Sequence, residues 1–60
     1  MSSILMSEVI DLARKKSKKF RFKNGEIDLH NFITYILSSY PNASKEENQS
    51  IVDVCVSIAY

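Results

Sequence analysis

The chain has 60 residues and a nearly balanced charge, with eight Lys and Arg against seven Asp and Glu. A chain of this length buries only about 60% of its unfolded surface and is close to the lower limit for independent folding. One Cys and one His exclude a disulfide framework and a structural zinc site, which needs about four ligands. Residues 1–60 are therefore expected to form one small domain, stabilised by packing or by a partner.

No segment has the pattern of a secretory leader or a membrane span. The stretch MSSILMSEVIDLA lacks an early basic region, and Glu8 and Asp11 interrupt its apolar part. The longest apolar tract, IVDVCVSIAY, is too short to cross a bilayer and contains Asp53. These segments predict no membrane contact. Because Cys55 has no partner cysteine, we also expect a reducing compartment and a cytoplasmic location.

Residues 2–20 have the spacing of an amphipathic helix. Its apolar or small stripe consists of Met6, Ile10, Ala13, Ser17 and Phe20, with Leu5, Val9 and Leu12 beside them. The acids lie in the N-terminal half and the bases in the C-terminal half, which suits the helix macrodipole. Like charges one turn apart offset this gain by a similar amount. Helix stability therefore neither requires nor forbids the basic run.

The stretch FRFKNGEIDL predicts a β-hairpin after this helix. It alternates about Asn24-Gly25, a strong signal for a two-residue type I′ turn. The predicted register opposes Phe20 with Leu29, Phe22 with Ile27, Arg21 with Asp28 and Lys23 with Glu26. Each opposite-charge pair contributes about 0.2–1 kcal/mol. Since a lone hairpin is marginal in water, we expect its apolar face to lie on the helices.

Seven of the eight cations fall within residues 14–23. The predicted hairpin gives two of them acidic partners, so five remain uncompensated. The predicted basic contact surface therefore consists of Arg14, Lys15, Lys16, Lys18 and Lys19. A solvated helix end is the equally simple alternative.

Two further segments complete the predicted fold. Residues 29–40 carry apolar side chains at helical spacing, with Asp28 as N-cap and Pro41 as terminator. Ser44 and Glu47 form a capping box that predicts a third helix. The fold class is therefore mainly α, with three short helices and a small β-hairpin between the first two. Alternation along residues 51–60 leaves a strand, and an α+β fold, as the alternative.

The sequence offers no site for catalysis or for a cofactor. The stretch NGEIDLHNF is similar to the second half of an EF-hand calcium loop, but Phe20, Phe22 and Asn31 stand where ligands should be, so calcium binding is rejected. His30, Cys55 and scattered carboxylates assemble no nucleophile and base, and no phosphate-binding glycine loop is present. We expect a protein that is not an enzyme and uses neither metal nor cofactor.

Two non-enzymatic functions remain. The first is a small regulator or inhibitor, of a size common in bacteria and their viruses, that docks on a protein with the basic surface aiding association. The apolar content of 45% is generous for so small a core, and it predicts a homodimer as well. The predicted apolar interface consists of Ile51, Val54, Cys55 and Ile58.

The alternative function is non-specific nucleic-acid binding by the basic segment 14–23. Exposed aromatic rings could stack on bases, as they do in many single-strand binders. The predicted hairpin argues against stacking, because its register points Phe20 and Phe22 at Leu29 and Ile27.

Overall fold

Apolar residues at helical spacing form three helices in the computed structural model, which describes residues 4–60. They are α1 (Met6–Ser17), α2 (Leu29–Ser38) and α3 (Lys45–Ala59), and a 3-10 helix, η1 (Lys18–Phe20), continues α1. The chain is therefore mainly α, as predicted, and residues 51–59 belong to helix α3 rather than to a strand. The first two residues of the predicted first helix lie outside the described residues, and α1 begins at Met6.

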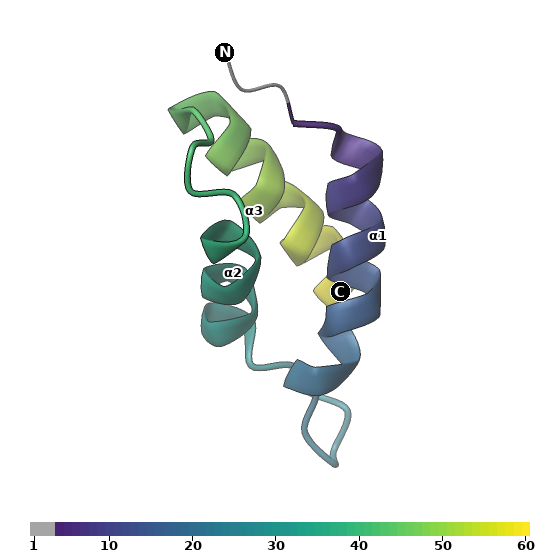
Figure 1. The fold of residues 1–60 in the computed structure, drawn as a ribbon. Helices are drawn as coiled ribbons and strands as arrows, with labels where there is room; N and C mark the ends of the chain where they lie inside the picture. Colours follow the sequence, from purple (N-terminus) through teal and green to yellow (C-terminus); the bar gives the residue numbers. More distant parts are fainter. Residues whose placement is uncertain (1–3) are drawn as a thin grey trace.

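Helix α3 is the centre of the packing. It contacts both other helices more extensively than α1 and α2 contact each other, and Figure 1 shows it crossing obliquely between them. Each helix contributes two side chains to a fully buried core. The core residues are Val9 and Ala13 of α1, Phe32 and Ile36 of α2, and Ile51 and Cys55 of α3.

The buried stripe of α1 runs through Val9, Ala13 and Ser17. Ser17 interrupts the lysine run because its position faces the interior, where its side chain is 6% exposed. Its hydroxyl donates to the backbone carbonyl of Arg14 at 2.9 Å, so the buried oxygen is not left without a partner. The cations on either side of Ser17 are thereby directed to the surface.

The predicted N-terminal signals of α2 and α3 behave differently. At α3 the capping box is complete, since the Glu47 N–H donates to the Ser44 hydroxyl at 3.1 Å and the Ser44 N–H donates to the Glu47 carboxylate at 2.8 Å. At α2, Asp28 occupies the N-cap, but its carboxylate accepts from the Asn31 side-chain amide at 2.6 Å and from no backbone N–H of the helix.

The predicted β-hairpin is wrong: within residues 4–60 the connection between η1 and α2 makes a single antiparallel bridge, between Arg21 and Ile27, and no strand. Two hydrogen bonds flank this bridge, from the Phe22 N–H to the Glu26 carbonyl and from the Asp28 N–H to the Phe20 carbonyl, both 2.7 Å. Arg21 therefore opposes Ile27 rather than Asp28. The register differs from the predicted one by a single residue.

The position of the turn explains the shift. A type I′ turn needs positive φ at both central residues, whereas here Gly25 alone, at φ 89°, has positive φ among the described residues. The Gly25 N–H donates to the Phe22 carbonyl at 3.0 Å, so the loop has three residues, Lys23, Asn24 and Gly25. The Asn24 side chain accepts from the Glu26 N–H at 3.0 Å and holds this loop in place.

A shift of one residue moves side chains to the opposite face. Ile27 packs against the core, but Phe22, predicted to lie over it, is 56% exposed. The ring of Phe20 instead packs in the interior, with its centroid 5.7 Å from that of Phe32 and 5.6 Å from that of Tyr35. In Figure 1 the loop projects beyond the ends of the helices.

Gly25→Val should destabilise the fold through the backbone alone. A Cβ at this position meets nothing within 4 Å, so the expected cost, about 1–3 kcal/mol, comes from forcing a β-branched residue to positive φ. Urea unfolding measures this loss. Gly25→Asn is the matched control, because Asn tolerates positive φ and should cost less. Equal midpoints for Gly25→Val and the parent would contradict the turn.

Glu47 should make α3 sensitive to acid. The Ser44 N–H donates to its carboxylate and lowers the pKa of Glu47 below its ordinary value. Because this pKa is lower in the folded than in the unfolded chain, the ionised carboxylate stabilises the fold at pH values above the ordinary pKa of Glu. This stabilisation is lost as the pH falls through the lowered pKa. Glu47→Gln, which can keep the capping box, should remove that part of the acid sensitivity measured by urea unfolding. Glu46→Gln, outside the capping box, should not.

Candidate interaction surfaces

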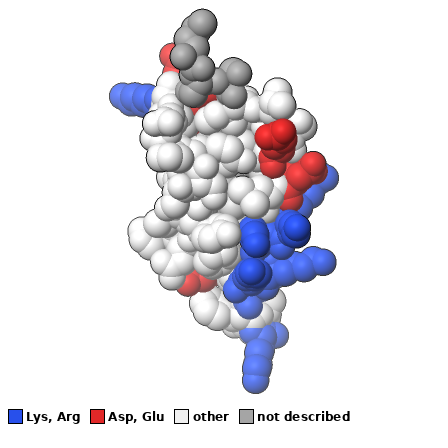
Figure 2. All heavy atoms as spheres, in the orientation of Figure 1, with Lys and Arg blue, Asp and Glu red and all other residues white. Residues whose placement is uncertain are grey.

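The predicted basic contact surface lies on the outside of α1 and η1. Arg14, Lys15, Lys18 and Lys19 are exposed, and Lys16 is half-buried. Figure 2 shows most of the blue side chains gathered on one side of the molecule, over the lower part of α1 and the loop, with acidic side chains at the upper border of this group. We call the four exposed cations the basic face.

The basic face carries charge that its own chain does not neutralise. Within residues 4–60 no hydrogen bond or ion pair engages the side-chain nitrogens of these four residues. Glu8 lies in the first turn of α1, and Asp11, one turn before Arg14 and Lys15, forms no ion pair with either of them. Four like charges along less than two helical turns repel one another, and an external anion would relieve that repulsion.

Arg21 has a different role from the one predicted. Its guanidinium donates to the Gly25 carbonyl at 2.9 Å and reaches the carbonyls of Ile58 and Ala59, each at 3.4 Å. Helix α3 has no basic residue in its own last turn, so Arg21 supplies a positive charge to the negative end of its dipole. This residue therefore ties the loop to α3 instead of pairing with Asp28.

The predicted apolar interface is divided by the fold. Ile51 and Cys55 are fully buried in the core of the single chain, where neither can contact a partner. Val54 and Ile58 lie half-buried on the side of α3 that faces α1. The apolar residues of α3 thus pack mainly against α1 and α2. The exposed apolar surface left on this segment is smaller than the sequence predicted.

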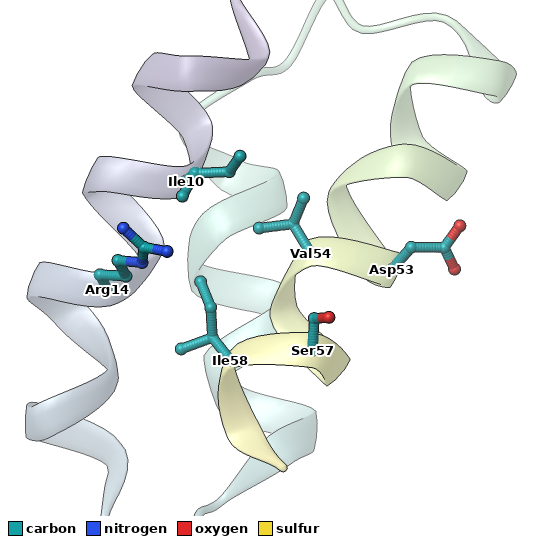
Figure 3. A pocket seen from close by; sticks show the side chains of 6 residues that line it. All are labelled: Ile10, Arg14, Asp53, Val54, Ser57 and Ile58. Atoms are coloured by element: carbon teal, nitrogen blue, oxygen red, sulfur yellow. The ribbon is translucent and has the colours of Figure 1, made fainter.

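An open groove lies where α1 and α3 meet, and we call it the α1/α3 groove. Its lining residues are Ile10, Arg14, Asp53, Val54, Ser57 and Ile58. In Figure 3 the apolar side chains of Ile10, Val54 and Ile58 converge between the two helices, and Arg14 borders them from α1. Asp53 points outward from the far side of α3. The groove therefore has an apolar floor, with one edge continuous with the basic face.

Cys55 and His30 are the residues with most catalytic potential, and neither is placed for catalysis within the described residues. Cys55 is a core residue, and burial raises the pKa of its thiol, which keeps it protonated and a poor nucleophile. His30 is exposed on α2. In the part of the chain that the structure describes, no three His, Cys, Asp or Glu side chains are grouped so that they could hold a metal ion. No helix among residues 4–60 has the length and apolar character needed to span a bilayer.

Two features of these surfaces could not be inferred from the sequence. The groove combines residues some 40 positions apart, and the exposure of Phe22 depends on a register that the sequence leaves ambiguous. No family model, curated protein or solved structure matches this chain.

Proposed function

We propose that this chain is a small non-enzymatic regulator that docks on an acidic protein partner through the α1/α3 groove. The partner segment would be an amphipathic helix with an apolar face for Ile10, Val54 and Ile58, and with carboxylates directed at Arg14 and the rest of the basic face. We further propose that the protein acts in the reducing cytoplasm, because its cysteine, Cys55, forms no disulfide.

One observation carries this proposal: a groove with an apolar floor adjoins a concentration of cations that form no ion pair within the described residues. An apolar floor favours binding by removing surface from water, at about 25 cal/mol per Å² of apolar area. Cations at the edge mainly raise the association rate and exclude basic partners. Together the two parts specify the partner's shape and charge.

The docking test uses two variants of the same helix. Val54→Ser removes apolar contact from the groove floor, whereas Val56→Ser makes the same change at a residue 39% exposed that does not line the groove. Each variant and the parent would serve as bait in nuclease-treated extract of the source cells, after circular dichroism has confirmed that all three are folded. We expect Val54→Ser to weaken capture about tenfold, or ~1.4 kcal/mol, and Val56→Ser to match the parent.

Equal loss by both variants, or equal retention, would contradict docking in the groove. The parent would also serve as bait in untreated extract, and capture seen only there would favour the alternative proposal, in which segment 14–23 binds nucleic acid. Exposed Phe22 supports that alternative, because the argument against base stacking depended on a register that the chain does not adopt.

Self-association stays a separate prediction. With Ile51 and Cys55 in the core, a homodimer would have to use exposed apolar residues of this end of the chain, Val56 and Tyr60. Light scattering at micromolar concentration should then give twice the 6.9 kDa of one chain, and Val56→Ser should shift the equilibrium toward the single chain. A 6.9 kDa species at every concentration would contradict the homodimer.

A further inference from the structure

Phe22 occupies an exposed position that the stability of the fold does not explain. Its side chain is 56% exposed, whereas Phe32 is fully buried and Phe20 packs against Phe32 and Tyr35. It lies on the loop that projects beyond the helices in Figure 1, immediately before the turn residues Lys23 and Asn24. An aromatic ring at this position is available to an external partner.

The loop presents this ring on a fixed backbone. The Phe22 N–H donates to the Glu26 carbonyl at 2.7 Å, and its carbonyl accepts from the Gly25 N–H at 3.0 Å. The adjacent Arg21 guanidinium reaches the Gly25 carbonyl on one side and the end of α3 on the other. Because both backbone groups of Phe22 are already bonded, little ordering of the loop is needed when a ligand binds.

Cations surround the ring along the sequence. Lys18 and Lys19 precede it, Lys23 follows it, and all three are exposed. Two acids stand on the returning arm of the loop: Glu26 is exposed, and Asp28 accepts from the Asn31 amide. Arg14 and Lys15 lie one turn before Lys18 and Lys19, so these five exposed cations fall within eight positions of Phe22 in the sequence.

We infer that this loop and the neighbouring basic face bind single-stranded nucleic acid, with Phe22 stacking on an unpaired base and the cations contacting phosphates. A stacking ring among lysines suits a ligand that alternates flat apolar bases with negative charges, and the stacking is tolerant of sequence. A duplex offers the phosphates but no free base face, so Phe22 adds nothing to duplex binding. This surface meets the α1/α3 groove at Arg14, but Phe22 does not line the groove, and the inference does not depend on the proposed docking.

The test measures fluorescence anisotropy of a labelled oligothymidylate of about 15 nucleotides, a length matched to one small binding domain. A duplex of the same length is the second ligand. We expect Phe22→Ala to weaken single-strand binding about 5- to 150-fold and to leave duplex binding unchanged, since stacking contributes about 1–3 kcal/mol per base. Leu5→Ala, which truncates an apolar side chain that is 61% exposed at the start of α1, is the control and should bind as the parent does.

Two further readouts separate stacking from a merely structural effect. The chain contains no Trp, so Phe22→Trp introduces a single fluorophore whose emission should be quenched by the oligonucleotide. Five phosphate contacts predict that log affinity falls with log salt at a slope of about −3.5 on a single strand. Lys45→Gln, a cation outside segment 14–23, should leave this slope unchanged.

The inference is overturned if no single-strand binding occurs at about 100 µM protein and about 50 mM salt, the weak end of non-specific affinity. It is equally overturned if Phe22→Ala and the parent bind the oligothymidylate alike, or if Phe22→Ala weakens duplex and single-strand binding equally. Failure of the docking proposal would appear separately, as equal capture by Val54→Ser and Val56→Ser.

Discussion

Phe32→Ala should leave the chain largely unfolded at 25 °C. Phe32 is the largest of the fully buried side chains, and its ring packs against Phe20 at 5.7 Å. Truncating a buried Phe to Ala typically costs about 3–5 kcal/mol, through lost transfer energy and the cavity that remains. A core in a chain this small rarely supplies more than about 3–5 kcal/mol in total. The far-UV circular dichroism of the variant, measured against urea, would show the loss.

Phe22→Ala is the matched control for this substitution. It removes the same atoms from a side chain that is 56% exposed, so we expect its unfolding midpoint to stay close to the parent's. A Phe32→Ala variant as stable as Phe22→Ala would mean that the core does not lie where α2 and α3 meet. The fold described above would then be wrong at its centre.

Replacing Lys15, Lys16, Lys18 and Lys19 together by Gln should change binding strongly and the fold hardly at all. The substitution removes repulsion between neighbours along with a favourable interaction with the helix dipole, and each effect is below about 1 kcal/mol. Half-buried Lys16 loses only its charged end, since Gln keeps part of the apolar stem. Thermal unfolding should therefore be nearly unchanged.

The loss in binding should appear in the rate of association. Steering by a charged surface raises association about tenfold to a thousandfold at low salt. The fourfold variant should therefore bind the captured acidic partner at least about tenfold more slowly, while its dissociation rate stays near the parent's. Surface plasmon resonance separates the two rates. An unchanged association rate in low salt would reduce the basic run to a solvated helix end.

The helices could be predicted because their signals are local. Apolar spacing over residues 29–40 and the Ser44–Glu47 capping box depend on side chains within one or two turns of each other, and both lead to the observed helices. The buried Ser17 also follows from its place on the stripe of α1. Such patterns determine which face of a helix is covered but not which neighbour covers it.

The loop was mispredicted because its sequence fits two turns. Asn24-Gly25 suits a two-residue loop with two positive φ values, and Lys23-Asn24-Gly25 suits a three-residue loop with one. The two-residue loop would place Phe22 on the core, whereas the three-residue loop places it in solvent. The contacts of Arg21 with Ile58 and Ala59, 37 and 38 residues away, favour the observed arrangement, and no local pattern reveals them.

The candidate groove was only half predictable. Val54, Ile58 and Arg14 were predicted as contact residues, but the sequence assigned them to separate surfaces. Packing of α3 against α1 brings them to one groove and buries Ile51 and Cys55. An apolar stripe on a helix looks the same whether it meets its own chain or a partner, so the division requires the tertiary structure.

Site-specific photo-crosslinking from Ser57 tests docking in the α1/α3 groove most directly. Ser57 lines the groove, and Ser38, an exposed serine of α2 that does not, is the control position for the same photoreactive residue. In nuclease-treated extract we predict that position 57 crosslinks to one protein segment, with apolar residues at helical spacing and carboxylates beside them, and that position 38 does not. Equal crosslinking from the two positions, or a basic segment at position 57, would contradict the proposal.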